Sequence, residues 1–309
     1  RRLVRTQDGL LSLLDEAVAA LFTNPGPREW RSRTALPETG AETSEVTITR
    51  HDQTLRLKRI NGDWRILQPV RADADDALVR QLVDLVRAVR IEDFEDDPSP
   101  EDLQVAAMDH PVMTIAATRE VRTVQPDGQV RIEPRTSLLV VGGKGDLEGR
   151  TRFARAGSSS PLLLIAVSDE LERLEPDPLA YASRTAVTVQ PANVGMLTLR
   201  DAKGEQGFRR DADGWVKLQA DGSRSPTDAE AVEATLTFLS SRLASDVLLA
   251  DDDAWSAPDS TITLYDFADG PLTTLALRRL DNGQLAVRAG DVELRYPASQ
   301  LPALLAQTP

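Results

Sequence analysis

The amino-acid sequence predicts an α+β fold of two tandem repeats, each a mainly antiparallel sheet packed by one long helix and a short closing helix. Three observations support this prediction. Short segments that alternate apolar and polar residues are separated by turn residues, which is typical of strands joined in hairpins. In each half, a stripe of apolar residues with helical spacing follows them. A motif of a polar turn, a tryptophan and a strand occurs at Trp64 and again at Trp215, 151 positions later.

The composition narrows the classes of function. The chain has 309 residues, 41% of them hydrophobic and 28% charged, as in globular proteins of about two domains. Its formal net charge of -13 argues against binding to nucleic acid, which needs a basic surface. The lack of cysteine excludes disulfides, cysteine-ligated zinc and thiol nucleophiles. The longest apolar runs, such as Leu162 to Val167, are too short to cross a bilayer. Because the chain begins at Arg1, we expect a processed product or a fragment of a longer protein.

Residues 1–43 are predicted to form an N-terminal helix and a linker. The polar stretch that runs to Ser44 has no clear period, as expected of a linker. Within it, residues 36–40 read Leu-Pro-Glu-Thr-Gly, the sorting pentapeptide of sortase substrates. A functional sorting signal lies near the C-terminus, so we interpret this match as a coincidence. The helix before the linker is predicted from apolar residues at helical spacing, Leu10, Leu14, Ala17, Val18 and Leu21, and ends at Asn24-Pro25-Gly26-Pro27.

The first repeat is predicted to span residues 44–182. Alternating residues around Val46, Leu55 and Trp64 predict three short strands, with an Asn61-Gly62 turn before the third. A long helix follows Pro69, and Asp73 or Asp75 can cap its start. Its apolar stripe consists of Leu78, Val79, Leu82, Val83, Leu85, Val86 and Val89. Thereafter we expect an acidic loop from Glu92 to Glu101, strands at 112–116, 136–141, 150–154 and 162–167, and a short helix at 168–174.

The second repeat, residues 183–309, is predicted to follow the same order. Asp228 comes after Trp215 much as Asp75 comes after Trp64, and it is expected to begin a long helix, with Thr227 and Glu230 as a capping box. The stripe of this helix is Val232, Leu236, Leu239 and Leu243. An acidic stretch at 251–253, strands at 261–267, 273–277, 284–288 and 292–296, and a short helix at 298–304 complete the repeat.

The glycine-rich run from Gly142 to Gly145 resembles a phosphate-binding loop only in part. Such a loop requires GxxxxGK[ST] at the start of a helix, whereas here Asp146, Glu148 and another strand follow. We therefore predict a hairpin turn.

Two acidic clusters, residues 73–76 and 251–253, contain the oxygen ligands that calcium prefers. Neither has the glycine and the distal glutamate of an EF-hand, which favours helix capping and exposed loops. His51 and His110 are predicted at the surface. Trp64 and Trp215 are predicted to pack the strands against the long helices rather than to bind carbohydrate or peptide. No catalytic, cofactor-binding or metal-binding residue is assigned, and no cofactor is expected.

A longer pattern in the first repeat resembles a known family. The run from Asn61 to Asp73, the helix at 77–90 and Met108-Asp109-His110-Pro111 before a strand are similar to an uncharacterised bacterial family. Its members are encoded beside gliding-motility-type ABC transport systems and are described as auxiliary components. The second repeat departs from the pattern, because Gln219 to Ser225 replaces the proline of Gln68-Pro69. The resemblance implies an N-terminal transmembrane helix that precedes this chain and an extracytoplasmic location at the inner membrane. It implies no site residue.

We therefore predict a non-enzymatic, extracytoplasmic accessory domain, membrane-tethered in the full-length protein, which binds an ABC transporter, an envelope component or an extracytoplasmic ligand. Two alternatives stay open. A hydrolase or carbohydrate-binding protein would need acids that converge in the fold, and a structural spacer would need no site. If function distinguishes the repeats, we expect the difference at residues 125–135 and 142–149, which have no clear counterpart in the second repeat. The candidates for a convergent acidic pocket are Asp109, Asp146, Asp251 and Asp253.

Overall fold

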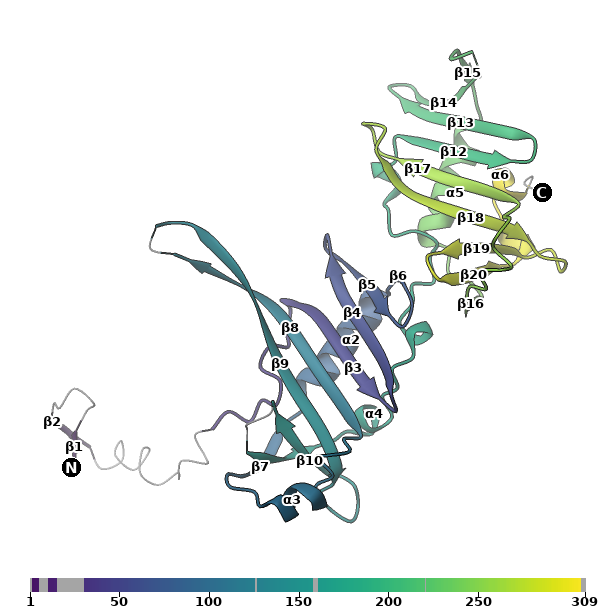
Figure 1. Ribbon diagram of the computed structural model, residues 1–309. Helices are drawn as coiled ribbons and strands as arrows, with labels where there is room; N and C mark the ends of the chain where they lie inside the picture. The colour runs from purple at the N-terminus through teal and green to yellow at the C-terminus, as the bar shows by residue number, and fades with distance from the viewer. Residues whose placement is uncertain are drawn as a thin grey trace. The chain divides into compact units, whose positions relative to one another are not determined.

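The computed structural model describes residues 2–5, 11–15, 31–125, 127–157, 161–219 and 221–306. Strands dominate these residues, with some helix. Two nine-stranded antiparallel sheets form most of the fold (Figure 1). A small sheet pairs β1 (Arg2–Arg5) with β2 (Leu11–Leu14).

The first sheet has the strand order β6-β5-β4-β3-β8-β9-β10-β11-β7. Its strands are β3 (Thr43–Arg50), β4 (Gln53–Ile60), β5 (Asp63–Gln68), β6 (Ala72–Asp73), β7 (Ile91–Glu95), β8 (Met113–Val124), β9 (Val130–Lys144), β10 (Thr151–Ala156) and β11 (Leu162–Ala166). The helices along this stretch of chain are α2 (Asp76–Arg87), α3 (Pro100–Val105) and α4 (Asp169–Glu172).

The second sheet has the order β15-β14-β13-β12-β17-β18-β19-β20-β16. Its strands are β12 (Met196–Asp201), β13 (Gly204–Asp211), β14 (Gly214–Leu218), β15 (Arg224–Pro226), β16 (Asp246–Leu249), β17 (Ser260–Tyr265), β18 (Pro271–Arg279), β19 (Leu285–Ala289) and β20 (Val292–Tyr296). The helices here are α5 (Ala229–Ser241) and α6 (Ala303–Ala306), with short 3-10 turns η1 (Pro178–Ala180), η2 (Pro191–Asn193) and η3 (Ala298–Gln300).

The two sheets share one topology. β3 holds the place in the first sheet that β12 holds in the second, β8 corresponds to β17, and the edge strands β7 and β16 correspond to each other. A long helix follows the fourth strand in both, α2 after β6 and α5 after β15. A tandem repeat predicts this correspondence. The domain boundaries proposed from the sequence, 1–43, 44–182 and 183–309, remain predictions.

The hairpin between β4 and β5 has the predicted turn. Asn61 has a φ of 54° and Gly62 a φ of 99°, so both adopt the left-handed backbone that tight two-residue hairpin turns require. Asparagine and glycine are the residues that tolerate this backbone best. The turn therefore fixes the position of Trp64 two residues later on β5.

Aspartates cap both long helices. The Asp75 carboxylate accepts hydrogen bonds from the backbone nitrogens of Ala77 and Leu78, at 2.9 and 3.1 Å. Asp228 accepts one from the backbone nitrogen of Ala231 at 3.1 Å. Each bond satisfies a backbone donor that has no partner within the helix. The predicted capping box of Thr227 and Glu230 is wrong, because Asp228 itself is the N-cap of α5.

The two tryptophans lie in the core, as predicted. Trp64 is 1% exposed and Trp215 is 5% exposed. An arginine from the preceding strand lies over each ring, Arg59 at 5.1 Å and Arg210 at 5.0 Å from the centroid. The indole nitrogen of Trp215 also donates to Glu233 of α5 at 2.9 Å. The same cation–π contact thus recurs at the same place in both repeats.

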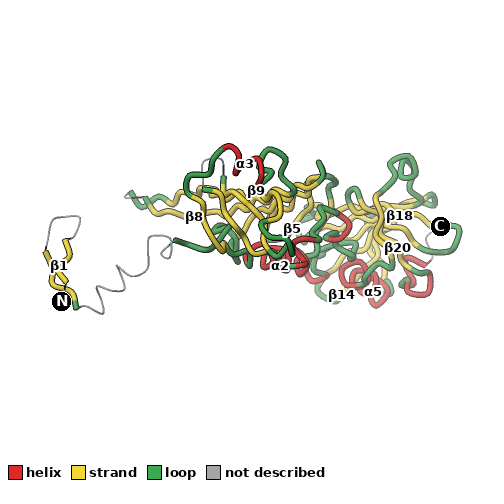
Figure 2. Tube along the Cα trace, turned by 90° about the horizontal axis from the view of Figure 1, so that it is seen from below, coloured by secondary structure: helices red, strands yellow, loops and turns green. Residues whose placement is uncertain are grey.

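The core of the second sheet combines strand and helix residues. Leu197, Ile262 and Leu294 from three strands belong to one buried cluster. Figure 2 shows α5 to one side of β18 and β20. The residues that α5 contributes to the cluster are Val232, Leu236 and Leu239, which share one helical face, and Phe238 beside that face.

The predicted acidic loop from Glu92 to Glu101 is wrong. Its first part belongs to β7, which pairs with β11, and Pro100 begins α3. Ile91 and Phe94 of β7 are buried, whereas its acids are exposed. Local propensity disfavours acids in strands, but an edge strand tolerates them because one of its sides faces solvent.

The N-terminal segment also differs from its prediction. Leu14 of the predicted helix lies in strand β2, while Leu10, Ala17, Val18 and Leu21 lie outside the described residues. The linker is partly packed: Leu36 is 1% exposed, and the carbonyl of Arg33 accepts a hydrogen bond from the backbone of Ile91 at 2.9 Å. The burial of Leu36 agrees with the interpretation of the sorting pentapeptide as a coincidence.

The density of contacts divides the chain into two compact units. Unit 1 consists of Arg1–Ala41, Asp84–Ala117 and Val121–Leu174, and unit 2 of Glu42–Val83, Thr118–Glu120 and Glu175–Pro309. Unit 2 therefore contains β3 to β6 together with the whole second sheet. Within the described ranges, no helix has the length and apolar character needed to cross a membrane.

Candidate functional site

The glycine run in unit 1 accommodates backbone rather than phosphate. Gly142 and Gly143 lie in the last part of β9, so the predicted turn begins later than expected. A Cβ atom at Gly142 would lie 2.1 Å from the carbonyl oxygen of Ala106 and from Cε of Met108. The backbone nitrogen of Gly143 donates to Ala106 at 2.8 Å. Glycine is required here because the chain that follows α3 crosses β9 at this point.

We expect Gly142→Ala to lower the free energy of unfolding by about 1–3 kcal/mol, since an added methyl group must displace a backbone carbonyl. Gly143→Ala is the matched control, because its Cβ would lie 3.5 Å from the nearest atom, an ordinary contact. Urea unfolding followed by circular dichroism measures the difference. Equal losses in the two variants would contradict the close-approach explanation.

The candidate acids do not form a common site. Among the described residues, no three histidines, aspartates or glutamates are placed to hold a metal ion. Asp146 accepts hydrogen bonds from the hydroxyl and backbone of Thr151 and from the backbone of Arg150, and the Thr151 hydroxyl is the main cause of its lowered pKa. Asp251 accepts from the backbone of Asp253 at 3.1 Å. Asp109 is exposed beside His110. These acids hold turns or face solvent.

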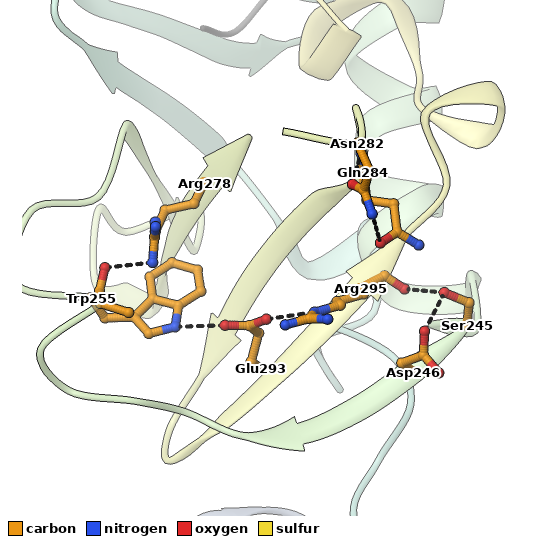
Figure 3. A network of polar contacts seen from close by, with 9 residues as sticks. Ser245, Asp246, Trp255, Arg278, Asn282, Gln284, Glu293 and Arg295 are labelled. Carbon is orange, nitrogen blue, oxygen red and sulfur yellow. Dashed lines mark hydrogen bonds and ion pairs between the residues drawn. The ribbon is translucent and has the colours of Figure 1, made fainter. Parts of the chain in front are cut away.

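The acidic loop at 251–253 is anchored by Trp255 (Figure 3). The indole nitrogen of Trp255 donates to Oε2 of Glu293 at 3.0 Å, and Nε of Arg295 donates to Oε1 at 2.7 Å. The Arg278 guanidinium lies 5.6 Å over the indole ring. Glu293 is only 7% exposed and both of its oxygens are engaged. This cluster therefore holds the loop on the outer face of the second sheet, opposite the core.

Both histidines are at the surface, as predicted. His51 lies in the turn between β3 and β4 with a φ of 49°, and its side chain is 69% exposed. The side chain of His110 is 89% exposed.

Unit 2 contains a cavity of about 700 Å³ that we call the arginine cavity. Four segments line it: part of β4 to β6, residues 186–189, the start of β18 and the turn between β19 and β20. Its volume lies within the range of small-molecule sites, about 300–1,000 Å³. Its charged lining residues are Arg56, Arg65, Arg71 and Asp73.

Backbone hydrogen bonds join the segments around the cavity. The carbonyl of Asp73 accepts from the backbone of Ser183, and the carbonyl of Tyr181 from the backbone of Asp75, both at 2.8 Å. On another side, Arg71 and Asp291 are joined twice. The backbone nitrogen of Asp291 donates to the carbonyl of Arg71, and the backbone nitrogen of Arg71 donates to Oδ2 of Asp291, each at 2.8 Å. Individual hydrogen bonds, three between backbone groups and one to the side chain of Asp291, thus hold these segments together.

Asp73 is the one acid among the described residues that line the cavity. Its carboxylate lies 3.1 Å from Nη1 of Arg65 and 3.5 Å from the hydroxyl of Thr188. Burial raises the pKa of Asp73, and Asp63 adds to this, whereas Arg65 and Thr188 oppose it. A carboxyl group perturbed by desolvation and a charge partner inside a cavity is typical of functional sites.

Sequence reasoning missed the arginines of this cavity. Arg56 and Arg65 stand on the polar side of their alternating strands, where exposed charges are ordinary. One pattern in the sequence could have indicated a basic surface: Arg56, Lys58 and Arg65 lie on the same face of two neighbouring strands. Nothing in the sequence, however, shows that residues 272–275, some 200 positions later, complete the wall.

Comparison with known proteins supplies one match. A family model described as "Domain of unknown function (DUF4340)" matches residues 64–261. The matched part begins at Trp64 and includes Arg65, Arg71 and Asp73 of the arginine cavity. No match was found among curated proteins. Because the match covers well over half of the 309 residues, the chain belongs to the DUF4340 family.

Proposed function

We propose that this chain is the extracytoplasmic binding domain of an accessory protein of an ABC-type transport system, tethered to the bacterial inner membrane in the full-length protein. It acts by binding and not by catalysis. In this proposal, two repeats of one scaffold, each a sheet covered on one face by its long helix, hold a binding site in unit 2. The resemblance of residues 61–73 and 108–111 to proteins encoded beside gliding-motility-type transporters supports the association.

The arginine cavity is the observation that carries this proposal. It combines apolar side chains with a few convergent polar groups, which is the usual composition of a small-molecule site. The candidate acids, in contrast, are engaged in separate turns, which weakens the case for an acidic hydrolase pocket. A purely structural spacer does not account for a cavity lined by three arginines.

Affinity purification from native bacterial membranes tests the association. We expect the tagged full-length protein to recover subunits of an ABC transporter, identified by mass spectrometry, and an excess of the untagged chain to displace them. Recovery that the untagged chain does not reduce would count as non-specific. Recovery of no transporter subunit would overturn the proposed association.

A further inference from the structure

The arginine cavity has a local charge opposite to that of the whole chain. Three arginines and one aspartate line it, a formal excess of two positive charges, whereas the protein carries a net charge of -13. Such an excess attracts anions because walls of low dielectric constant focus the field of the charges. A cavity that gathers arginines in an acidic protein therefore favours an anion.

Two of the arginines have guanidinium N–H groups that are available to donate hydrogen bonds to a ligand. Among the described residues the Arg71 guanidinium has no hydrogen-bond or ion-pair partner, and only the backbone of this residue is engaged. Arg56 uses Nε to donate to Glu45 at 2.7 Å, which leaves its two terminal amino groups without a partner in the same residues. Guanidinium groups match the geometry of carboxylate and phosphate oxygens, to which they donate paired hydrogen bonds.

The wall also contains apolar side chains that are incompletely buried, beside the polar residues Gln68, Thr188, Thr273 and Thr274. Ile60 and Leu272 line the cavity and remain 37% and 38% exposed. Val189 and Ala289, which are partly buried, extend this apolar surface. Large apolar side chains exposed inside a concave site are stabilised when an apolar ligand covers them. A purely inorganic anion would leave this surface in water.

We propose that the arginine cavity binds a small amphipathic anion, a carboxylate or phosphate group attached to an aliphatic body. The charged group lies against Arg71 and Arg56, and the body covers Ile60 and Leu272. This inference rests on the proposed function, because it names the ligand of that binding site.

The proposal includes a dependence on pH. Asp73 is the acid that lines the cavity among the described residues; its carboxylate faces Arg65 and Thr188, and the charge of Asp63 also acts on it. Glu45 and Asp291 are engaged with Arg56 and with the backbone of Arg71. Since the pKa of Asp73 is raised, its carboxyl group gains a proton before an ordinary aspartate does as the pH falls. Loss of its charge increases the positive excess of the cavity. We expect affinity for an anion of constant charge to rise as the pH falls through the raised pKa of Asp73.

Isothermal titration calorimetry with the whole chain tests the ligand class. The probes are octanoate and octyl phosphate, which distinguish a carboxylate from a phosphate headgroup. Inorganic phosphate tests the charged group alone, and 1-octanol tests the aliphatic body alone. We expect at least one octyl anion to bind at least about tenfold more tightly than inorganic phosphate or 1-octanol, because the charged hydrogen bonds and the buried methylene groups both contribute. Binding of 1-octanol as tight as that of both anions would overturn the role of the arginines.

Two substitutions locate the site. We expect Arg71→Gln to weaken binding of the octyl anion about tenfold, the loss of one charged hydrogen-bonded pair. Arg200→Gln is the control, because Arg200 is an exposed arginine of β12 that does not line the cavity. Leu272→Ser should reduce the preference for octanoate over butanoate. If the Arg71 and Arg200 variants bind the octyl anion with equal affinity, the anion does not bind at Arg71 and the proposed site is wrong.

Octanesulfonate measures the pH dependence, because its charge does not change over this range. We expect its affinity to rise on acidification with the natural chain and to stay constant with Asp73→Asn. A rise that persists in Asp73→Asn would assign the effect to another group. If no octyl anion binds while transporter subunits are still recovered from membranes, the ligand class is wrong and the association stands. If an octyl anion binds but no transporter subunit is recovered, the ligand class stands and the proposed association with a transporter is wrong.

Discussion

Replacement of Trp215 by alanine is expected to lower the free energy of unfolding of unit 2 by about 3–5 kcal/mol. Trp215 is 5% exposed and belongs to the buried cluster of the second sheet. Its removal leaves a large cavity between β14 and α5, and it takes away both the ring beneath Arg210 and the donor to Glu233. Urea unfolding followed by far-UV circular dichroism measures the loss.

Trp215→Phe separates packing from hydrogen bonding. Phenylalanine keeps an aromatic ring in the core and under Arg210 but lacks the indole nitrogen that donates to Glu233 at 2.9 Å. We expect this variant to lose about 2–3 kcal/mol, because a hydrogen bond to a charged group contributes about 1.5–3 kcal/mol and a little packing is lost as well. A loss of under about 1 kcal/mol in the alanine variant would show that this tryptophan is not a main part of the core.

Gly290→Ala is expected to destabilise the wall of the arginine cavity. Gly290 has a φ of 67°, and a Cβ at this position would lie 2.3 Å from the carbonyl oxygen of Arg71. That carbonyl accepts the hydrogen bond from Asp291, so the two segments must separate to admit a methyl group. We expect a loss of about 2–4 kcal/mol, which combines backbone strain with overpacking. Differential scanning calorimetry should show a lower unfolding temperature, and titration with octanoate should show weaker binding.

Gly283→Ala is the matched control for this substitution. Gly283 has a φ of 81°, so alanine meets a similar backbone strain, but its Cβ would only contact the Cβ of Ala298 at 3.8 Å. We expect a loss of about 1 kcal/mol and unchanged binding of the octyl anion. If the two variants lose the same stability and bind equally well, the contact between Gly290 and Arg71 does not shape the cavity.

Much of the scaffold could be predicted because local rules and tertiary structure agree there. The Asn61-Gly62 turn, the aspartate caps and the buried tryptophans each follow from short stretches of sequence. The sequence does not predict β7, because its acids oppose strand propensity and only its pairing with β11 makes it a strand. It predicts a turn at the glycines of β9, because the crossing segment that requires them lies more than 30 positions earlier in the chain.

By itself, the sequence determined the strand-rich repeats, the positions of both long helices and the burial of Trp64 and Trp215, because hydrophobic periodicity and turn chemistry are local properties. Only the tertiary structure decided which charges meet. Arg56, Arg65 and Arg71 look like ordinary surface charges along the chain, and they become a site where residues 272–275 and 289–290 approach them. A cavity is a property of segments distant in sequence, so no local pattern specifies its ligand.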